Sequence, residues 1–450
     1  MGHSDILNVS RYIDDRPQDG VFRVNRDIYV DPALFELEHR FIFERTWAFL
    51  AHESQLPEAN DFYSTAIGRV PVLLMRDEQG RVGAFLNSCR HKGAMLTRVE
   101  AGNRKHHVCP YHGWGYRSDG TNAGIKDVHA GAYAAGFAAE SHDLVRIARV
   151  AEYRGLIFGS LSADVPPLED FLGSMRFFID LAVEQGDGEM EFVPGRVSFV
   201  YNGNWKLQMD NGLDFYHLTS THTSMMDIMR RRESGQGHVD AKSFTWDKRQ
   251  NIEGGSFQLR HGHAAVWQHQ PEASKRPVYS RMDALRKRLG DVKAEWVLKT
   301  KNSAIFPNMQ LHDGTSLLVR IARPLAVDRT EMRYWCFAPR NDTPAQRSWR
   351  LRQFEDFFNS SGLATPDDSV VYEDCQRGYA AKPMQWLQGF QRAMAVERPG
   401  RNREAEETGI DPVSTTNGLF SLAGEVCFHP LYREWARLME AGAAGAKAYG

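Results

Sequence analysis

Asp214, His217 and His222 place one carboxylate and two imidazoles in a short stretch of the chain. Residues 205–218 are predicted to form a helix, because apolar residues recur among polar ones. On that helix Asp214 and His217 share a face, whereas His217 and His222 lie about 140° apart. The two imidazoles can therefore bind one ion only if the helix ends or widens between them. The Thr- and Ser-rich residues 218–221 suit such a break. Taken alone, such a set is more often structural than metal-binding.

Two tight loops offer a second ligand set. Cys89 and His91 stand in Cys-x-His spacing, and Cys109 and His112 in Cys-x-x-His spacing. Two thiolates on one iron and two imidazoles on the other form a Rieske [2Fe–2S] centre. The alternative is a structural zinc site with the same ligand types. Zinc sites usually pair Cys with Cys in one knuckle, so the mixed loops favour the cluster.

The elements around these loops are predicted to form a small β-rich unit. The N-terminal part, to about residue 44, is predicted to be mostly helical. Strands are expected at 69–75 and 82–86, with turn residues between them. The apolar runs at 145–151 and 155–161 complete the unit.

A second region is predicted to be an antiparallel sheet with helices packed on it, an α+β arrangement. After a linker at Pro166 and Pro167, a helix is expected at 168–183. Residues 230–237 are interpreted as a mobile loop over the pocket. The alternating pattern of apolar residues indicates half-buried strands. The expected strands are 196–201, 256–260, 264–268, 303–311, 316–324 and 331–338, followed by a helix at 345–360.

Composition restricts the function classes. At 450 residues, the chain is expected to form two or three domains. Its net charge of -2 argues against nucleic-acid binding. No apolar run approaches the ~20 residues that cross a membrane, so a cytoplasmic protein is expected. Five cysteines without a disulfide pattern indicate reduced thiols, and those at 336, 375 and 427 are interpreted as buried.

From about residue 22 to 437, the chain resembles the large (α) subunit of Rieske non-haem iron aromatic-ring-hydroxylating oxygenases. The motifs Cys89-Arg90-His91 and 109–114 (CPYHGW) match the family's cluster motif, and 211–222 match its mononuclear iron motif. Residues 31–38, 51–55 and 153–161 are most similar to the benzoate, toluate and halobenzoate dioxygenase branch. That branch generally has Glu where this chain has Asp210, which keeps the charge on a shorter side chain.

The resemblance implies a domain plan. Residues 1–43 would be an N-terminal helical segment that packs on the catalytic domain. Residues 44–163 would be a small all-β Rieske [2Fe–2S] domain, and 164–450 a catalytic domain of the helix-grip (START-like) type, with helices on an antiparallel sheet.

The resemblance also implies site residues. Cys89, His91, Cys109 and His112 would hold the cluster. His217, His222 and Asp368 would bind a mononuclear Fe(II), with Asp367 as the second choice for the carboxylate. Physical reasoning alone gives another account of this acidic pair, because carboxylates near a helix N-terminus cap backbone N–H groups. Asp214 would take part in catalysis by linking an iron histidine to a cluster histidine of the neighbouring subunit.

The implied function is a terminal oxygenase that adds both atoms of O₂ to an aromatic ring, with a benzoate-like carboxylate as the expected substrate, to give a cis-dihydrodiol. Electrons would come from NADH through a separate flavin/iron–sulfur reductase, directly or through a ferredoxin. A small β subunit would complete an α3β3 assembly. The alternatives are a Rieske monooxygenase or demethylase acting on another aromatic compound, and a Rieske electron carrier. A carrier leaves most of the chain unexplained, and a respiratory Rieske protein needs an additional cysteine in each loop.

The substrate pocket is the least determined part. Arg320 or Arg323 could bind a substrate carboxylate. Five apolar residues could line the pocket or pack in the core with equal reason: Met209, Leu213, Phe215, Leu218 and Ile305. His261 and His263 are expected on a surface strand rather than at a metal site.

Overall fold

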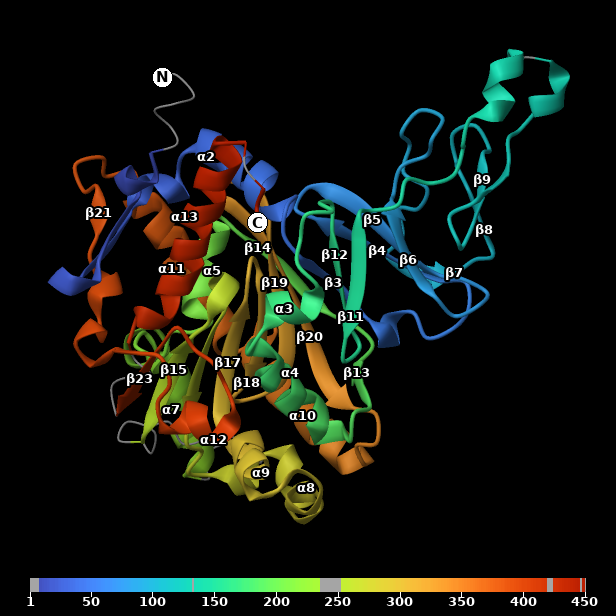
Figure 1. Ribbon diagram of the computed structural model, residues 1–450. Helices are drawn as coiled ribbons and strands as arrows, with labels where there is room; N and C mark the ends of the chain where they lie inside the picture. Colours follow the sequence, from blue (N-terminus) through green and yellow to red (C-terminus); the bar gives the residue numbers. More distant parts are fainter. Residues whose placement is uncertain (1–7, 132, 235–251, 419–423, 446, 450) are drawn as a thin grey trace. The chain divides into compact units, whose positions relative to one another are not determined.

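The computed structural model describes residues 8–131, 133–234, 252–418, 424–445 and 447–449 (Figure 1). The chain folds into two compact units. The smaller unit is Phe43–Leu168, to which the final residues Tyr449–Gly450 also belong. The larger unit joins Met1–Ile42 to Glu169–Ala448.

The smaller unit is built from three antiparallel sheets. One is four-stranded, in the order β6-β5-β4-β7, and the others follow the orders β11-β12-β3 and β10-β9-β8. The predicted hairpin is confirmed, because β5 and β6 pair antiparallel with Leu73 opposite Phe85. The strands are β3 (Ala48–His52), β4 (Asp61–Ile67), β5 (Val70–Arg76), β6 (Val82–Leu86), β7 (Ala101–Asn103), β8 (His106–Val108), β9 (Gly115–Arg117), β10 (Asn122–Gly124), β11 (Arg149–Tyr153) and β12 (Leu156–Ser160).

The N-terminal segment is mostly helical in its described part, as predicted, but two strands interrupt it and most of its helices are short 3-10 or π turns. Its one α-helix in the described part is α2 (Pro32–Glu38), where the Asp31 side chain accepts a hydrogen bond from the Ala33 N–H at 2.8 Å. Before it, β1 (Ile13–Arg16) pairs with β2 (Val21–Asn25), and β2 also pairs with the distant β21 (Trp386–Leu387). This long-range pairing leaves no signal in the local sequence pattern, so the two strands were not predicted.

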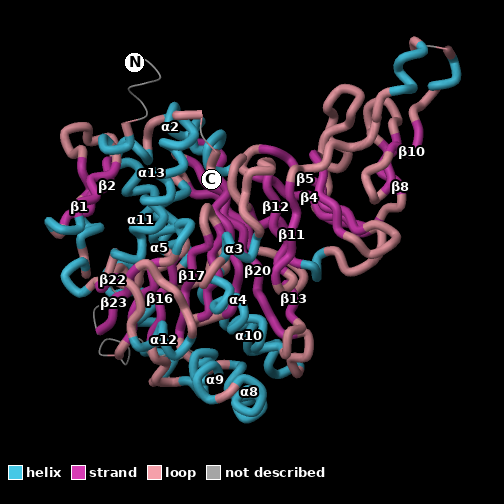
Figure 2. Tube along the Cα trace, in the orientation of Figure 1, coloured by secondary structure: helices cyan, strands magenta, loops and turns pink. Residues whose placement is uncertain are grey.

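The larger unit contains one extended antiparallel sheet (Figure 2). Its order is β13-β20-β19-β18-β17-β16-β15-β23-β22, and β14 also pairs with β20. The predicted strand at 303–311 is instead two strands joined by a turn at Pro307, which has no backbone N–H to donate. The strands are β13 (Met190–Phe192), β14 (Val197–Tyr201), β15 (Gly254–Gln258), β16 (Ala264–Gln268), β17 (Thr300–Ile305), β18 (Met309–Asp313), β19 (Leu317–Ala326), β20 (Arg329–Pro339), β22 (Arg398–Pro399) and β23 (Ser414–Gly418).

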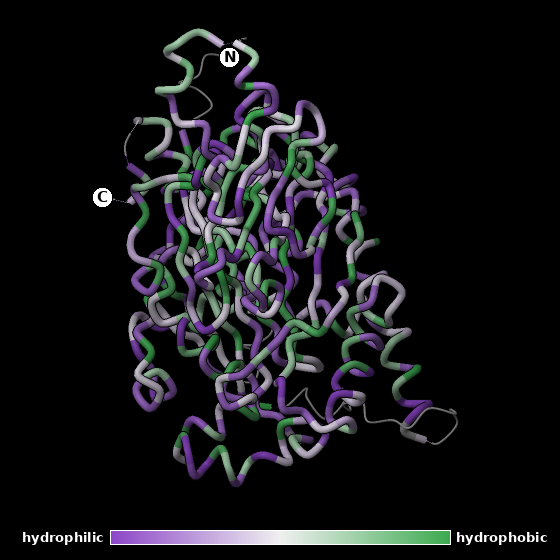
Figure 3. The backbone as a smooth tube through the Cα atoms, turned by 90° about the vertical axis from the view of Figure 1, so that its right-hand side faces the viewer, coloured by the Kyte–Doolittle hydropathy of each residue, from purple (hydrophilic) through white to green (hydrophobic). Residues whose placement is uncertain are grey.

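Helices pack against this antiparallel sheet, which gives the predicted α+β fold. The hydropathy of successive residues changes over short distances along the chain (Figure 3), as expected for elements with one buried face. The predicted helix at 168–183 is split at Gly173, whereas the helix predicted at 345–360 is confirmed as α10. The α-helices of this unit beyond α2 are α3 (Leu168–Leu172), α4 (Met175–Val183), α5 (Trp205–Asn211), α6 (Leu218–Thr221), α7 (Thr223–Glu233), α8 (Met282–Leu289), α9 (Asp291–Leu298), α10 (Pro344–Phe358), α11 (Thr365–Gly378), α12 (Arg403–Thr408) and α13 (His429–Ala443).

The two sheet faces carry different residues because side chains alternate along a strand. On one face, Gln310 of β18 stands between Ala304 of β17 and Arg320 of β19, and helix α5 packs here. On the other face, Phe178 of α4 contacts Phe257 of β15. The first face forms the floor of the pocket described below.

Candidate metal centres

Helix α5 ends at Asn211, seven residues before the predicted end at Leu218. Asn204 caps its start, since its side chain accepts a hydrogen bond from the Lys206 N–H at 3.1 Å. At the other end, Gln310 Nε2 donates to the carbonyls of Gln208 and Met209, each at 3.0 Å. The sheet thus binds carbonyl groups at the end of this helix. The chain then turns through residues 212–217, and α6 and α7 follow.

Gly212 stands where the chain leaves α5 and lies against the sheet. A Cβ atom built on it would lie 1.9 Å from Gln310 Nε2. Its carbonyl accepts a hydrogen bond from Asn302 Nδ2 of β17 at 3.1 Å. Position 212 therefore has no room for a side chain, and this contact determines where the residues after it lie.

Gly212→Ala is expected to destabilise the larger unit by about 2–4 kcal/mol, because Gln310 must move and lose its buried hydrogen bonds. Chemical denaturation followed by tryptophan fluorescence measures this change. Gly378→Ala at the end of α11 is the matched control, because a Cβ there meets nothing within 4 Å. Equal stability of the two variants would contradict the proposed role of the contact.

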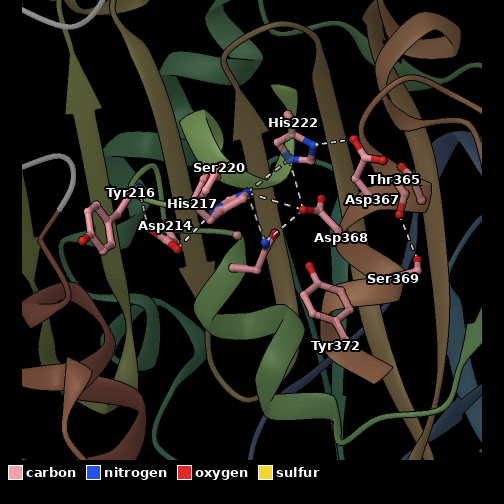
Figure 4. A network of polar contacts seen from close by, with 12 residues as sticks. Asp214, Tyr216, His217, Ser220, His222, Thr365, Asp367, Asp368, Ser369 and Tyr372 are labelled. Carbon is pink, nitrogen blue, oxygen red and sulfur yellow. Dashed lines mark hydrogen bonds and ion pairs between the residues drawn. The ribbon is translucent and has the colours of Figure 1, made fainter. Parts of the chain in front are cut away.

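The break in the helix brings three donor atoms together (Figure 4). His217 Nε2 lies 3.2 Å from His222 Nε2, and Asp368 Oδ1 lies 3.4 Å from the first and 3.1 Å from the second. Donors on adjacent corners of an octahedron with bonds of ~2.1 Å are roughly 3 Å apart. The three groups therefore fit one face of a six-coordinate metal ion, and the chemistry of this donor set suits Fe(II).

Each histidine is held by a carboxylate on its other ring nitrogen. His217 Nδ1 contacts Asp214 Oδ2 at 3.1 Å, and His222 Nδ1 contacts Asp367 Oδ2 at 3.2 Å. The first contact was expected from the spacing, but the second replaces the capping role considered for Asp367. The N-cap of α11 is Ala364, and it has no side-chain cap. Both Nε2 atoms consequently point toward Asp368.

Hydrogen bonds within the site shift the pKa values of His217 and Asp368. Burial lowers the pKa of His217, but the hydrogen bonds with Asp214 and Asp368 outweigh burial and raise it to about 10. Burial raises the pKa of Asp368, but hydrogen bonds from the two histidines hold it below its ordinary value. The free site thus favours a protonated His217, and a metal ion has to displace that proton.

Asp367→Asn is expected to weaken iron binding about 10–100-fold, because the carboxylate that orients His222 is lost. Iron content after dialysis against a graded series of chelator concentrations measures the effect. Asp374→Asn is the control, since Asp374 lies on the same helix and pairs with Arg377 at the surface. The same iron retention in both variants would show that Asp367 does not orient the ligand.

The two Cys/His loops of the smaller unit share one backbone geometry. In the first, Cys89 N–H donates to the Ala94 carbonyl at 2.9 Å, and Gly93 N–H donates to the Cys89 carbonyl at 2.9 Å. In the second, Cys109 donates to Trp114 at 2.8 Å and Gly113 donates to Cys109 at 3.1 Å. Gly93 and Gly113 have φ angles of 75° and 74°, a conformation that favours glycine. The loops are structurally equivalent turns.

The four side chains of these loops fit a mixed Cys/His cluster. The imidazole rings of His91 and His112 have centroids 4.3 Å apart. Their Nδ1 atoms are buried and have no hydrogen-bond partner among the described residues, as expected of atoms that bind a metal. Burial raises the pKa of the Cys89 thiol, and Tyr116 Oη lies 3.3 Å from its sulfur. Desolvation and His91 lower the pKa of His112, which favours the neutral ligand form.

A pocket adjoins the histidine–aspartate site and encloses about 530 Å³ of space, part of it open to solvent. Of the apolar residues that were predicted to lie either in the pocket or in the core, Phe215 and Leu218 line the pocket. Met209, Leu213 and Ile305 lie in the core. The floor of the pocket consists of alternate strand residues, of which Arg320 was considered from the sequence, whereas Thr300, Asn302 and His312 were not. The residues that line the pocket are Asn211, Gly212, Asp214, Phe215, His217, Leu218, His222, Met225, Thr300, Asn302, His312, Gly314, Thr315, Arg320, Phe357, Phe358, Ala364 and Asp368.

Two other sequence predictions were wrong. His261 lies in a 3-10 helix, and His263 is buried against the Phe171 carbonyl at 3.0 Å rather than on a surface strand. Residues Arg230–Arg232 belong to helix α7 and not to a loop, while 235–237 lie outside the described residues.

Two other expectations agree with the structure in the described residues, except that one of the cysteines predicted to be buried is not. Of the three remaining cysteines, those at 336 and 427 are buried and the one at 375 is half-buried. No helix in the described part of the chain has the length and apolar composition that a membrane crossing requires.

Comparison with known proteins gives the family. The "Rieske [2Fe-2S] domain" family matches residues 46–138, and the "Ring hydroxylating alpha subunit (catalytic domain)" family matches residues 189–441.

Similar proteins and structures support this match. The chain is 38% identical to toluate 1,2-dioxygenase subunit alpha of Pseudomonas putida over 86% of its own length and 87% of the relative's. It is 37% identical to 2-halobenzoate 1,2-dioxygenase large subunit of Burkholderia cepacia over 96% of its own length and 93% of the relative's. A solved structure of naphthalene 1,2-dioxygenase from Rhodococcus sp. bound to indole superposes with a TM-score of 0.79 at 26% identity. The superposition covers 93% of this chain and 94% of that structure's chain. The chain therefore belongs to the alpha subunits of the Rieske ring-hydroxylating oxygenases.

Proposed function

We propose that this alpha subunit adds both atoms of O₂ to the ring of a benzoate-like aromatic carboxylate, giving a cis-dihydrodiol. The observation that carries the proposal is the convergence of His217, His222 and Asp368 beside a pocket, in a chain whose other unit has paired Cys/His loops. The named substrates of the relatives toluate, 2-halobenzoate and anthranilate dioxygenase are aromatic carboxylates, which supports this substrate class.

The proposal assigns two metal centres. Cys89 and Cys109 hold one iron of the [2Fe–2S] cluster, and His91 and His112 hold the other. His217, His222 and Asp368 hold a mononuclear Fe(II), with Asp368 preferred over Asp367 because only its carboxylate faces both Nε2 atoms. Residues 44–163 are the proposed Rieske domain, 164–450 the catalytic domain, and 1–43 a segment that packs on the latter.

The chain's own residues prepare the reaction. Asp214 and Asp367 fix the two imidazoles, so His217, His222 and Asp368 would hold an iron ion with three ligands and leave room for O₂ beside it. Phe215, Phe357 and Phe358 provide an apolar wall that can hold an arene against this open face and displace water. When bound, the cluster supplies electrons and the ferrous ion supplies the centre at which O₂ reacts.

The proposed partners follow from the family. Its members are terminal oxygenases that work with a reductase and a ferredoxin, and NADH is the electron source. We propose that a flavin/iron–sulfur reductase serves this chain, directly or through a ferredoxin. The relatives named as large subunits support a small β subunit, and we propose an α3β3 assembly. Asp214 is then the residue through which a cluster histidine of one subunit reaches His217 of its neighbour.

Turnover with reductase, NADH and ¹⁸O₂ tests the proposal on benzoates, anilines and aromatic hydrocarbons. The expected result is a diol of benzoate that carries two ¹⁸O atoms. A product with one ¹⁸O atom, a dealkylated product, or turnover confined to uncharged compounds would contradict the proposed function.

A further inference from the structure

Arg320 is a buried cation on the floor of the pocket. Its side chain is 5% exposed, and it lines the same pocket as His217 and Asp368. It stands opposite Gln310 on one side and Tyr334 on the other, so its side chain lies on the face that carries the pocket floor.

The surroundings of Arg320 are neutral. Its Nε donates to Gln310 Oε1 at 2.7 Å, and its guanidinium carbon lies 5.4 Å from the centre of the Tyr334 ring and 6.0 Å from that of Phe358. Within the described part of the chain, no carboxylate oxygen lies within 4.0 Å of its guanidinium nitrogens. The pocket's own acid at the metal site, Asp368, instead faces the two histidines.

Most other cations of this unit that are buried to a similar degree have acidic partners. The exception in the described residues, Lys299, lies over the Trp267 and Trp296 rings and does not line the pocket. Lys206 Nζ lies 2.5 Å from Glu38 Oε1, and Arg350 Nε lies 3.0 Å from Asp342 Oδ2. Arg276 pairs with Asp313. A buried charge without a counter-ion is costly, and folded chains rarely keep one without a use for it. The uncompensated charge of Arg320 therefore points to an anion that enters the pocket.

We infer that Arg320 binds the carboxylate of the substrate and thereby determines specificity for aromatic acids; this rests on the proposed function above. Its Nε is already held by Gln310, so the Nη groups, which lie beside Tyr334 and contact no carboxylate of the described residues, are those that can donate to a substrate carboxylate. Gln310 Nε2 is itself fixed to the end of helix α5, which makes the guanidinium a rigid anchor. With the carboxylate held on the floor, the ring lies among the pocket's phenylalanines.

Arg323 provides an internal comparison on the same strand. It lies three residues further along β19, does not line the pocket, and pairs with Glu331 Oε2 at 3.1 Å. Of the two arginines considered from the sequence, only Arg320 thus faces the pocket without an acidic partner in the described residues.

The test compares benzoate with benzamide, a neutral molecule of nearly the same shape, by calorimetric titration of the anaerobic holoenzyme. Wild-type protein is expected to bind benzoate at least about 30-fold more tightly than benzamide. Arg320→Met is expected to reduce this ratio to about 3 or less, mainly through weaker benzoate binding. Arg323→Met is expected to keep the wild-type ratio.

Arg320→Gln keeps a buried hydrogen-bond donor and gives the same comparison if the methionine variant does not fold. Cluster absorption and iron content, unchanged from wild type, show that each variant is intact. An intact variant that retains the wild-type benzoate-to-benzamide ratio would overturn the inference. If wild-type protein neither binds nor hydroxylates benzoate or related aromatic acids, the proposed function fails instead.

Discussion

Asp368→Ala is expected to abolish oxygenation while the iron–sulfur cluster remains intact. Asp368 Oδ1 faces both histidine Nε2 atoms, at 3.4 Å and 3.1 Å, and it is the carboxylate of the described metal-ligand group. Without it, two imidazoles remain, and a first-row metal ion held by two neutral ligands is readily lost. Iron content should fall from three to two atoms per chain, and turnover by at least about 1,000-fold.

Two variants of helix α11 make this result specific. Asp374→Ala removes an exposed carboxylate that pairs with Arg377, and it should retain full iron content and turnover. Asp367→Ala should keep part of the mononuclear iron, because Asp367 contacts His222 through Nδ1 rather than facing the metal position. If Asp367→Ala lost the mononuclear iron completely and Asp368→Ala retained it, Asp367 would be the iron ligand and Asp368 would not.

Asp214→Asn is expected to reduce turnover by at least about 100-fold in protein that is reconstituted with excess iron and still holds all three irons. Asp214 Oδ2 contacts His217 Nδ1 at 3.1 Å, while its Oδ1 accepts a hydrogen bond from the Tyr216 N–H at 2.6 Å. The amide keeps the shape but lacks the charge that fixes the ring's proton on Nδ1. The imidazole remains close enough to bind iron, whereas the hydrogen-bonded route proposed for electrons is impaired.

A single-turnover measurement separates this role from a merely structural one. Reduced holoenzyme is mixed with benzoate and O₂, and reoxidation of the cluster is followed by its visible absorption. The rate should fall in Asp214→Asn and stay normal in Asp227→Asn, which removes an exposed acid that pairs with Arg230 on α7. A normal reoxidation rate in Asp214→Asn would leave Asp214 with no role in electron delivery.

The local motifs carried most of the information that could be obtained from the sequence. The Cys89 and Cys109 loops were recognised because their ligands lie close together in the chain and their turns need glycine. The alternating pattern predicted strands at 316–324 and 331–338, which correspond to β19 and β20. These features depend on neighbours in sequence, which local patterns describe well.

The missed features depend on contacts between distant segments. Helix α5 ends at Asn211 because Gln310, about a hundred residues away, binds its last carbonyls. Asp367 appeared to be a helix cap because nothing near it in sequence reveals that His222 lies within 3.2 Å. Before α2, strand β2 pairs with β1 and with the distant β21. In each case tertiary contacts decide between local alternatives of similar energy.

The central claim is that one polypeptide holds two separate iron centres. The most direct measurement is Mössbauer spectroscopy, with metal analysis, of wild-type protein reconstituted anaerobically with ⁵⁷Fe and sulfide. We expect about three irons per chain, two in a [2Fe–2S] cluster with unlike iron sites and one high-spin ferrous ion. Zinc in the Cys/His loops, or a cluster without the third iron, would contradict the account.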